Sequence, residues 1–282
     1  MRIFLAADGA AGLKSARLIS RAGHVLVGVA APATVANQPL ASFAEGNAAE
    51  VFPGTTVKDP AFAGWLSTNK TDVLLSVHTS HIVHPQVLSA AAAGAFNLHP
   101  GPLPAYAGRN PVSWAIFNGE TRHAATLHWM DPEIDAGPVV AINEVEIAPG
   151  DTALDLMAKT SNAGLVAVRH LLEDLAAGRE ISSMPQNAEA RRYFSAKNIP
   201  LDGLATWNFP ADRIGRYIRA NNFGPFPSPW PKPRLRIDGR DMIVVDVDLG
   251  SPTGGVPAGT VEGSRVAASD FWLRCSVREP QE

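Results

Sequence analysis

The chain has 282 residues, of which 24 are Lys or Arg and 27 are Asp or Glu, so its formal net charge is −3. Because 46% of the residues are hydrophobic and 18% are charged, the chain can bury a core, and the composition excludes a protein that is disordered throughout. No 18-residue stretch is apolar enough to predict a membrane span, the first residues do not resemble a secretory signal, and the single cysteine, Cys275, cannot form an internal disulfide, so we expect a cytoplasmic protein.

The first 180 residues alternate between short apolar runs and stretches with helical periodicity, around a loop-like stretch at residues 31–58. The apolar runs lack polar alternation, as in strands buried on both faces, and their separation by helices favours a parallel sheet. The predicted strands are Ile3–Ala7, His24–Ala30, Asp72–Val77, Ala95–Leu98, Ala124–Met130 and Val139–Ile147. The predicted helices are Ala11–Ala22, Asp59–Leu66, Pro85–Ala93 and a long one from Asp151 or Thr152 to Gly178. This pattern predicts an α/β fold with a doubly wound, mostly parallel Rossmann-like sheet.

The rest of the chain has a different character and a different charge. Residues 1–180 carry a net charge of −5 and residues 181–282 a net charge of +2, with seven basic residues and one acidic residue between Arg213 and Arg240. The predicted elements are a basic helix at Pro210–Asn221, a Pro- and aromatic-rich segment at Asn222–Pro233, a hairpin at Leu235–Val247 around Asp238–Gly239, and short strands at Gly259–Val261 and Phe271–Val277. We therefore predict a catalytic domain at residues 1–180, a linker at 181–206 and a small β-rich C-terminal domain at 207–282.

One polar pair lies where ligands bind in such sheets. Asn97 and His99 end an apolar strand with a spacing of two residues, so both side chains share one face of the sheet. Open α/β sheets bind ligands at the carboxyl ends of their strands. An acidic loop at residues 131–138 follows the next strand, and a carboxylate from it could orient or charge His99. Taken alone, the same pattern also fits an Asn and a His that only form structural hydrogen bonds at the end of a strand, followed by an ordinary acidic turn.

The stretch Asn97–Gly137 resembles the formyltransferases that use 10-formyltetrahydrofolate. The matching segments, in order, are NLHP, PLPAYAG, NPVSWAIFNGE, HAATLHWM and DPEIDAGPV, and a weaker likeness extends over residues 1–178 and into DGLATW and RIGRYIRA of the tail. The resemblance implies direct formyl transfer from 10-formyltetrahydrofolate to an amine. In that reaction Asn97 and a protonated His99 would stabilise the oxyanion, and Asp135 would raise the pKa of His99 and accept the amine proton. No metal is expected.

The resemblance also implies where the folate binds. The implied folate-binding residues are Val77, His78, His81, Ile82, Val83, Met130, Asp131 and Ile134. The sequence departs from the family in this region, because HTSHIVH replaces an aromatic-Gly turn and Ala107 replaces a common Arg whose charge Arg109 could supply. The spacing of His78, His81 and His84 also suggests a metal, but no carboxylate or Cys completes a ligand set, so a folate-binding loop is favoured. Beyond the resemblance, we expect acceptor contacts at Arg109, Asn110, Trp114, Trp129 and the segment 222–230, whose aromatic and proline residues equally fit packing between domains.

The identity of the acceptor is the main open question. An enzyme acting on tRNA needs a sizeable cationic domain to neutralise phosphates, whereas this chain is acidic and its tail is nearly neutral. We therefore expect a primary amine or hydroxylamine of a small metabolite, either an amino sugar on a nucleotide or an ornithine-type amine, and neither nucleic acid nor membrane as partner. The alternatives are methionyl-tRNA formyltransferase, a hydrolase that deformylates the same folate, and a non-catalytic folate-binding protein.

Overall fold

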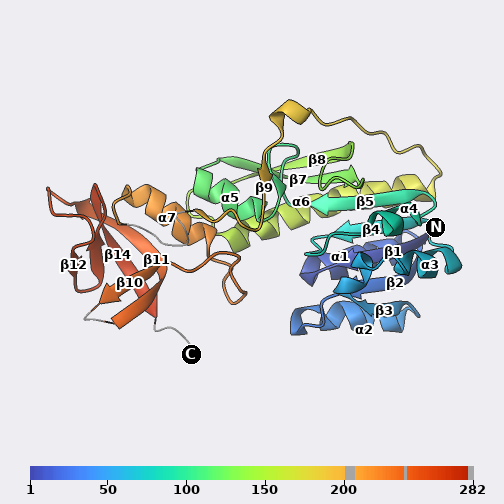
Figure 1. The fold of residues 1–282 in the computed structure, drawn as a ribbon, viewed down its shortest axis with the longest axis horizontal. Coiled ribbons are helices and arrows are strands. Elements are labelled where there is room, and N and C mark those ends of the chain that lie inside the picture. Colours follow the sequence, from blue (N-terminus) through green and yellow to red (C-terminus); the bar gives the residue numbers. More distant parts are fainter. Residues whose placement is uncertain (201–206, 238–239, 279–282) are drawn as a thin grey trace. The chain divides into compact units, whose positions relative to one another are not determined.

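The computed structural model describes residues 1–200, 207–237 and 240–278, which form two compact units (Figure 1). Unit 1 comprises Met1–Gly108, Ala124–Val145 and Lys159–Tyr193, and unit 2 comprises Arg109–His123, Glu146–Ala158 and the chain from Phe194 onward. The chain therefore passes between the units several times. The predicted domain limits at residues 180 and 207 stay a prediction.

A seven-stranded sheet with the order β3-β2-β1-β4-β5-β7-β8 organises unit 1. Its strands are β1 (Arg2–Ala7), β2 (Val25–Ala31), β3 (Glu50–Pro53), β4 (Val73–Val77), β5 (Gly94–His99), β7 (Arg122–Trp129) and β8 (Val139–Glu146). The first five pair in parallel, and β7 runs antiparallel to β5. The predicted doubly wound, mostly parallel sheet is thus confirmed.

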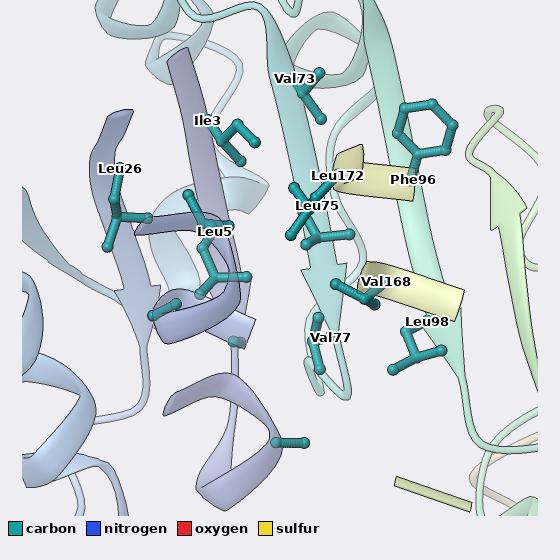
Figure 2. Packing of buried hydrophobic residues seen from close by; sticks show 14 of the residues in the cluster. Ile3, Leu5, Leu26, Val73, Leu75, Val77, Phe96, Leu98, Val168 and Leu172 are labelled. Atoms are coloured by element: carbon teal, nitrogen blue, oxygen red, sulfur yellow. The ribbon is translucent and has the colours of Figure 1, made fainter. Parts of the chain in front are cut away.

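Helices cover both faces of this sheet, which explains why its inner strands β1 and β4 are almost entirely apolar. One face carries Leu5, Leu75 and Leu98 and packs against α1 (Gly9–Arg21), α2 (Gln38–Gly46) and α6 (Ala153–Ala176) (Figure 2). The other face carries Phe4 and Leu74 and packs against α3 (Phe62–Thr68) and α4 (Pro85–Ser89). Successive side chains of a strand point to opposite faces, so each strand supplies both cores. None of the helices in the described ranges has the length and apolar character needed to cross a membrane.

The structure corrects the sequence reading in two places. Residues 31–58, read as a loop, contain helix α2 and the edge strand β3, whose residues are partly or fully exposed and therefore lack a continuous apolar run. Helix α5 (Pro111–Asn118), between the predicted strands, was also missed. It begins after Asn110, which adopts a left-handed conformation with φ of 59°, and ends at Gly119, also left-handed.

Unit 2 contains the predicted β-rich C-terminal part. Its five-stranded sheet has the order β10-β11-β14-β13-β12, with β10 (Arg234–Ile237), β11 (Arg240–Pro252), β12 (Val261–Glu262), β13 (Arg265–Ala267) and β14 (Phe271–Arg278). Helix α7 (Ala211–Ala220) precedes it, and the turn predicted at Asp238–Gly239 lies outside the described residues. Cys275 lies buried on β14, and burial raises the pKa of its thiol to about 12. A thiol in that state is a poor nucleophile.

Candidate active site

The structure brings Asn97, His99 and Asp135 together at one end of β5. Nδ1 of His99 lies 3.5 Å from Oδ2 of Asp135, and the amide nitrogen of Asn97 donates to Oδ1 of the same carboxylate at 3.4 Å. Asn97 and His99 occupy alternate positions of β5 and so face the same side. Asp135 reaches them from the loop between β7 and β8. The predicted pair on the strand and the predicted carboxylate therefore form one cluster.

The hydrogen bonds of His99 determine which of its nitrogens can take part in chemistry. Nε2 lies 2.7 Å from the backbone oxygen of Tyr106. Because a carbonyl oxygen only accepts, Nε2 carries a proton and donates it there. Nδ1, which faces Asp135, is therefore the nitrogen whose protonation can change. When Nδ1 is protonated, His99 is a cation held beside a carboxylate.

Asp135 is a nearly buried carboxylate in a strained backbone conformation. Its φ is 53°, in the left-handed region, and its side chain is 9% exposed. Burial by itself opposes ionisation. However, the neighbouring His99 and His128 and the N–H of Gly108, which donates to Oδ2 at 2.8 Å, together hold the pKa of Asp135 well below its usual range. Asp135 is therefore negatively charged and a weak base, and it stabilises positive charge nearby.

His128 is a member of this cluster that the sequence analysis missed. It lies directly opposite Asn97 in the β5–β7 ladder, and its Nε2 is 3.1 Å from the amide nitrogen of Asn97 and 3.6 Å from Oδ1 of Asp135. Its Nδ1 donates to the backbone oxygen of Trp129 at 2.7 Å, so Nε2 is the ring nitrogen that faces Asn97 and Asp135. The segment HAATLHWM contained this residue, but only the strand register shows that it faces Asn97.

A glycine fixes the path of the loop that carries Asp135. A Cβ atom at Gly137 would collide with the backbone oxygen of Trp129, so no other residue fits there without moving the chain. The loop returns to β8 through a backbone hydrogen bond from Trp129 to Pro138. The glycine two residues after Asp135 in the segment DPEIDAGPV thus has a steric cause.

The predicted folate-binding residues lie on two stretches of unit 1, the segment after β4 and the loop after β7. They are Val77, His78, His81, Ile82, Val83, Met130, Asp131 and Ile134. The side chain of Val77 is fully buried in the core on the sheet face that carries Leu5, Leu75 and Leu98, away from Asn97. Val77 can therefore offer only its backbone groups to a folate. Val83 and Met130 pack on the sheet face that also carries Asn97, whereas Ile82 is 60% exposed. Their contacts with a folate stay a prediction.

His78 is the most unusual of these residues. It follows β4 directly, at the position beside the end of β5, and its φ of 56° is again left-handed. Its Nε2 is buried without a hydrogen-bond partner. Burial, with a smaller contribution from the positive charge of His99, lowers the pKa of His78 to about 4. His78 is therefore neutral at physiological pH.

This lowered pKa predicts an acid-dependent loss of stability. The unfolded chain takes up a proton at His78 near pH 6.5 and the folded chain only near pH 4, so the stability is complete above pH 6.5 and falls as the pH drops toward 4. We expect the variant His78→Asn, which cannot titrate there, to lose about 3 kcal/mol less unfolding free energy than the wild type between pH 7 and pH 4. Urea unfolding of both proteins measures this difference. Parallel pH curves would contradict the assignment.

The predicted acceptor-binding residues are not all brought to the cluster. Trp129 packs on Phe96, with ring centroids 4.2 Å apart, on the face opposite to Asn97. Arg109, Asn110 and Trp114 belong to unit 2, where the ring of Trp114 stacks on that of Phe194 and meets that of Trp230 edge to face. The rings of Trp114 and Trp129 are thus engaged in packing. Acceptor contacts by these four residues stay a prediction.

Among the described residues, His78, His81 and His84 are not grouped as a set of metal ligands. Within the described ranges, no three His, Cys, Asp or Glu side chains are grouped so that they could hold a metal ion. His84 instead accepts a hydrogen bond from the N–H of Gln86 and caps helix α4. His81 packs beside Gly54.

Comparison with known proteins identifies similar sequences and folds. A family model described as formyl transferase matches residues 18–170, which is more than half of the chain. An N-formyltransferase from Helicobacter canadensis, solved in complex with folinic acid and dTDP-3-aminofucose, has 18% sequence identity and a TM-score of 0.72 over 98% of this chain and 99% of its own.

Two further solved structures share the fold. A 4-N formyltransferase from Francisella tularensis has 18% identity and a TM-score of 0.67 over 86% of this chain and 96% of its own. HypX from Aquifex aeolicus in complex with tetrahydrofolic acid has 18% identity and a TM-score of 0.67 over 99% of this chain but only 44% of its own. At these identities the likeness establishes the fold, and the roles of individual residues have to be argued from the site.

Proposed function

Because the chain belongs to the formyl transferase family, we propose that it moves the formyl group of 10-formyltetrahydrofolate to a primary amine of a small metabolite, with Asn97, His99 and Asp135 at the reacting centre. The observation that carries this proposal is the convergence of these three side chains at the carboxyl end of β5. Folate derivatives are bound in two of the similar structures, which supports a folate as the formyl donor.

The proposed reaction is a direct transfer. The amine nitrogen attacks the formyl carbon, the new C–N bond forms, and negative charge develops on the formyl oxygen. Asn97 and the protonated Nδ1 of His99 are donors suited to that oxygen. The bond to N10 of the folate then breaks, and the proton lost by the amine ends on N10. No covalent enzyme intermediate is required.

The low pKa of Asp135 refines its proposed role. A general base works best when its pKa lies near the working pH. Asp135 is held far below that range, so its first task is to place a negative charge 3.5 Å from Nδ1 of His99, the proposed oxyanion donor. Its second task, as acceptor of the amine proton, requires that the proton pass on to N10 rather than remain on the carboxylate.

The acceptor is best assigned to the small-molecule class, and an amino sugar linked to a nucleotide is the favoured member. The similar enzyme solved with dTDP-3-aminofucose supports this choice. The basic residues of α7 do not form a free cationic surface. Arg213 lies over the ring of Phe209 at 4.3 Å, Arg216 pairs with Asp212 at 3.3 Å, and Arg219 is half-buried, which lowers its pKa. An ornithine-type amine remains the second candidate.

Turnover of 10-formyltetrahydrofolate, followed by absorbance, tests the proposal. We expect product formation with a nucleotide-linked amino sugar in a panel that also contains ornithine, N-hydroxyornithine, methionyl-tRNA and no amine. Turnover without any amine would favour the hydrolase. If the folate binds but no panel member is formylated, the non-catalytic alternative gains support, and efficient formylation of methionyl-tRNA alone would contradict the small-molecule class.

Salt dependence separates the small amine from tRNA independently. An enzyme that contacts six or more phosphates loses roughly 10³-fold or more in affinity between about 50 and 200 mM salt. We expect kcat/KM for the preferred small amine to change far less over that range. We also expect bulk tRNA at moderate salt not to inhibit transfer, measured as the initial rate with and without tRNA. Strong competitive inhibition by tRNA would argue for the tRNA enzyme.

A further inference from the structure

The segment of residues 184–193, which was predicted to be linker, contacts the loop that carries Asp135. Backbone hydrogen bonds between Met184 and Val139 run in both directions, at 2.7 and 2.8 Å, and attach the start of the segment to β8. The amide nitrogen of Gln186 then donates to the backbone oxygens of Asp135 at 3.0 Å and Gly137 at 2.7 Å. The side chain of Gln186 thus bridges two backbone carbonyls of the loop between β7 and β8, which carries Asp135.

Arg191 makes a second bridge from the same segment. Its Nη2 donates to the backbone oxygen of Ile134 at 2.6 Å and its Nη1 to that of Asp135 at 3.2 Å. Its Nε lies 3.5 Å from the carboxylate of Glu133, which is 71% exposed, so this ion pair adds little. The guanidinium fork matches two successive carbonyls, a geometry that a lysine cannot reproduce.

The backbone at residues 104–108, which contacts His99 and Asp135, also forms hydrogen bonds with this segment. The N–H of Arg192 donates to the oxygen of Pro104 at 3.2 Å, and the N–H of Ala107 donates to the oxygen of Arg192 at 3.1 Å. The stretch held in this way supplies the Tyr106 carbonyl that anchors His99 and the Gly108 N–H that binds Asp135. The segment therefore contacts both backbone stretches on which the triad depends.

We propose that Gln186 and Arg191 are positioning residues that hold Asp135 in its left-handed conformation and so aim its carboxylate at His99. A non-glycine residue in this conformation costs of the order of 1–3 kcal/mol and persists only where its surroundings enforce it. The loop from residue 130 to residue 138 contains no helix or strand, so contacts with other segments contribute to that constraint. The four carbonyl contacts of Gln186 and Arg191 do so without touching the reacting atoms. This role rests on the proposed formyl transfer.

Steady-state kinetics of Arg191→Ala and Gln186→Leu test the proposal. A shift of about 1 Å at a catalytic group can lower the rate of the chemical step by about 10²-fold. We therefore expect kcat to fall on the order of 10–10²-fold with little change in KM for the folate. Guanidinium ion should restore part of the kcat of Arg191→Ala, whereas Arg191→Lys should remain impaired. The matched control is Arg179→Ala, which removes an exposed arginine paired with Asp174, and it should keep wild-type kcat.

The crystal structure of the double variant Gln186→Leu, Arg191→Ala provides a readout that does not depend on activity. We expect Asp135 to leave the left-handed region and its carboxylate to move away from His99 and the Gly108 N–H. If Asp135 keeps its conformation, or if the double variant keeps kcat within about twofold of an active wild type, the positioning role is wrong. A wild type that transfers no formyl group would overturn the proposed function instead, and the crystal structure would still decide the positioning role.

Discussion

Replacing His99 by alanine, or Asp135 by asparagine, is expected to lower kcat by about 10²–10⁴-fold, which is the range that positioned acid–base groups contribute. His99→Ala removes the proposed cationic donor to the oxyanion. Asp135→Asn keeps the size of the side chain, and asparagine tolerates a left-handed backbone. It removes the negative charge that lies 3.5 Å from Nδ1 of His99. Initial rates with saturating 10-formyltetrahydrofolate and acceptor measure the loss.

Two residues of α6 away from the triad provide matched controls for these substitutions. His170 is exposed and Asp174 is half-buried and paired with Arg179, and His170→Ala and Asp174→Asn should retain wild-type kcat. Circular dichroism and thermal unfolding establish that each variant is folded. Folate affinity should change little, because the triad acts on the reacting atoms. Turnover near the wild-type rate in folded His99→Ala or Asp135→Asn would remove that residue from the mechanism.

Asn97 gives the second large effect that we expect. Loss of one oxyanion donor typically raises the barrier by about 2.7–4 kcal/mol, so Asn97→Ala should lower kcat by roughly 10²–10³-fold. Asn97→Asp should be worse, because it places a second carboxylate beside Asp135, at the point where negative charge develops. The amide nitrogen of Asn97 now lies 3.4 Å from Asp135 and 3.1 Å from His128, so the variant replaces two attractive contacts with repulsion at Asp135.

Asn162→Asp is the matched control for the aspartate substitution. Asn162 lies on α6 and accepts a hydrogen bond from Lys14 at the surface, so a carboxylate is tolerated there. This variant should keep its kcat, whereas folded Asn97→Asp should be nearly inactive. If Asn97→Asp were as active as the wild type, Asn97 could not be a donor to the oxyanion.

The sequence predicted the parts of the site that follow strand periodicity. The apolar run before Asn97 identified β5, and the two-residue spacing placed Asn97 and His99 on one face. The same rule identified the other buried strands of the sheet. This rule did not predict edge strand β3, because an exposed edge strand needs no continuous apolar run. Helix α5 was not predicted because it has only eight residues and lies within the motif NPVSWAIFNGE, although its proline and the glycine after it are ordinary helix-boundary residues.

What the sequence could not predict depends on contacts between distant segments. His128 is identified as a neighbour of Asn97 only through the register of β5 against β7, which no local pattern encodes. The left-handed conformation of Asp135 depends on donors some 50 residues further along the chain, in a segment that has almost no regular structure of its own. Contacts between a side chain and a distant backbone group produce no periodic pattern in the sequence, so periodicity cannot predict them.

The three proposed catalytic groups differ in the stability of the structure that carries them. Asn97 and His99 belong to a central strand of the large sheet, so they separate only when that sheet unfolds. Asp135 belongs to an irregular loop, and loops open locally at a lower free energy than the core of a protein. We therefore expect mild heating or low denaturant to displace Asp135 while the sheet stays folded. We also expect activity to return on cooling or dilution, because β5 keeps Asn97 and His99 in place.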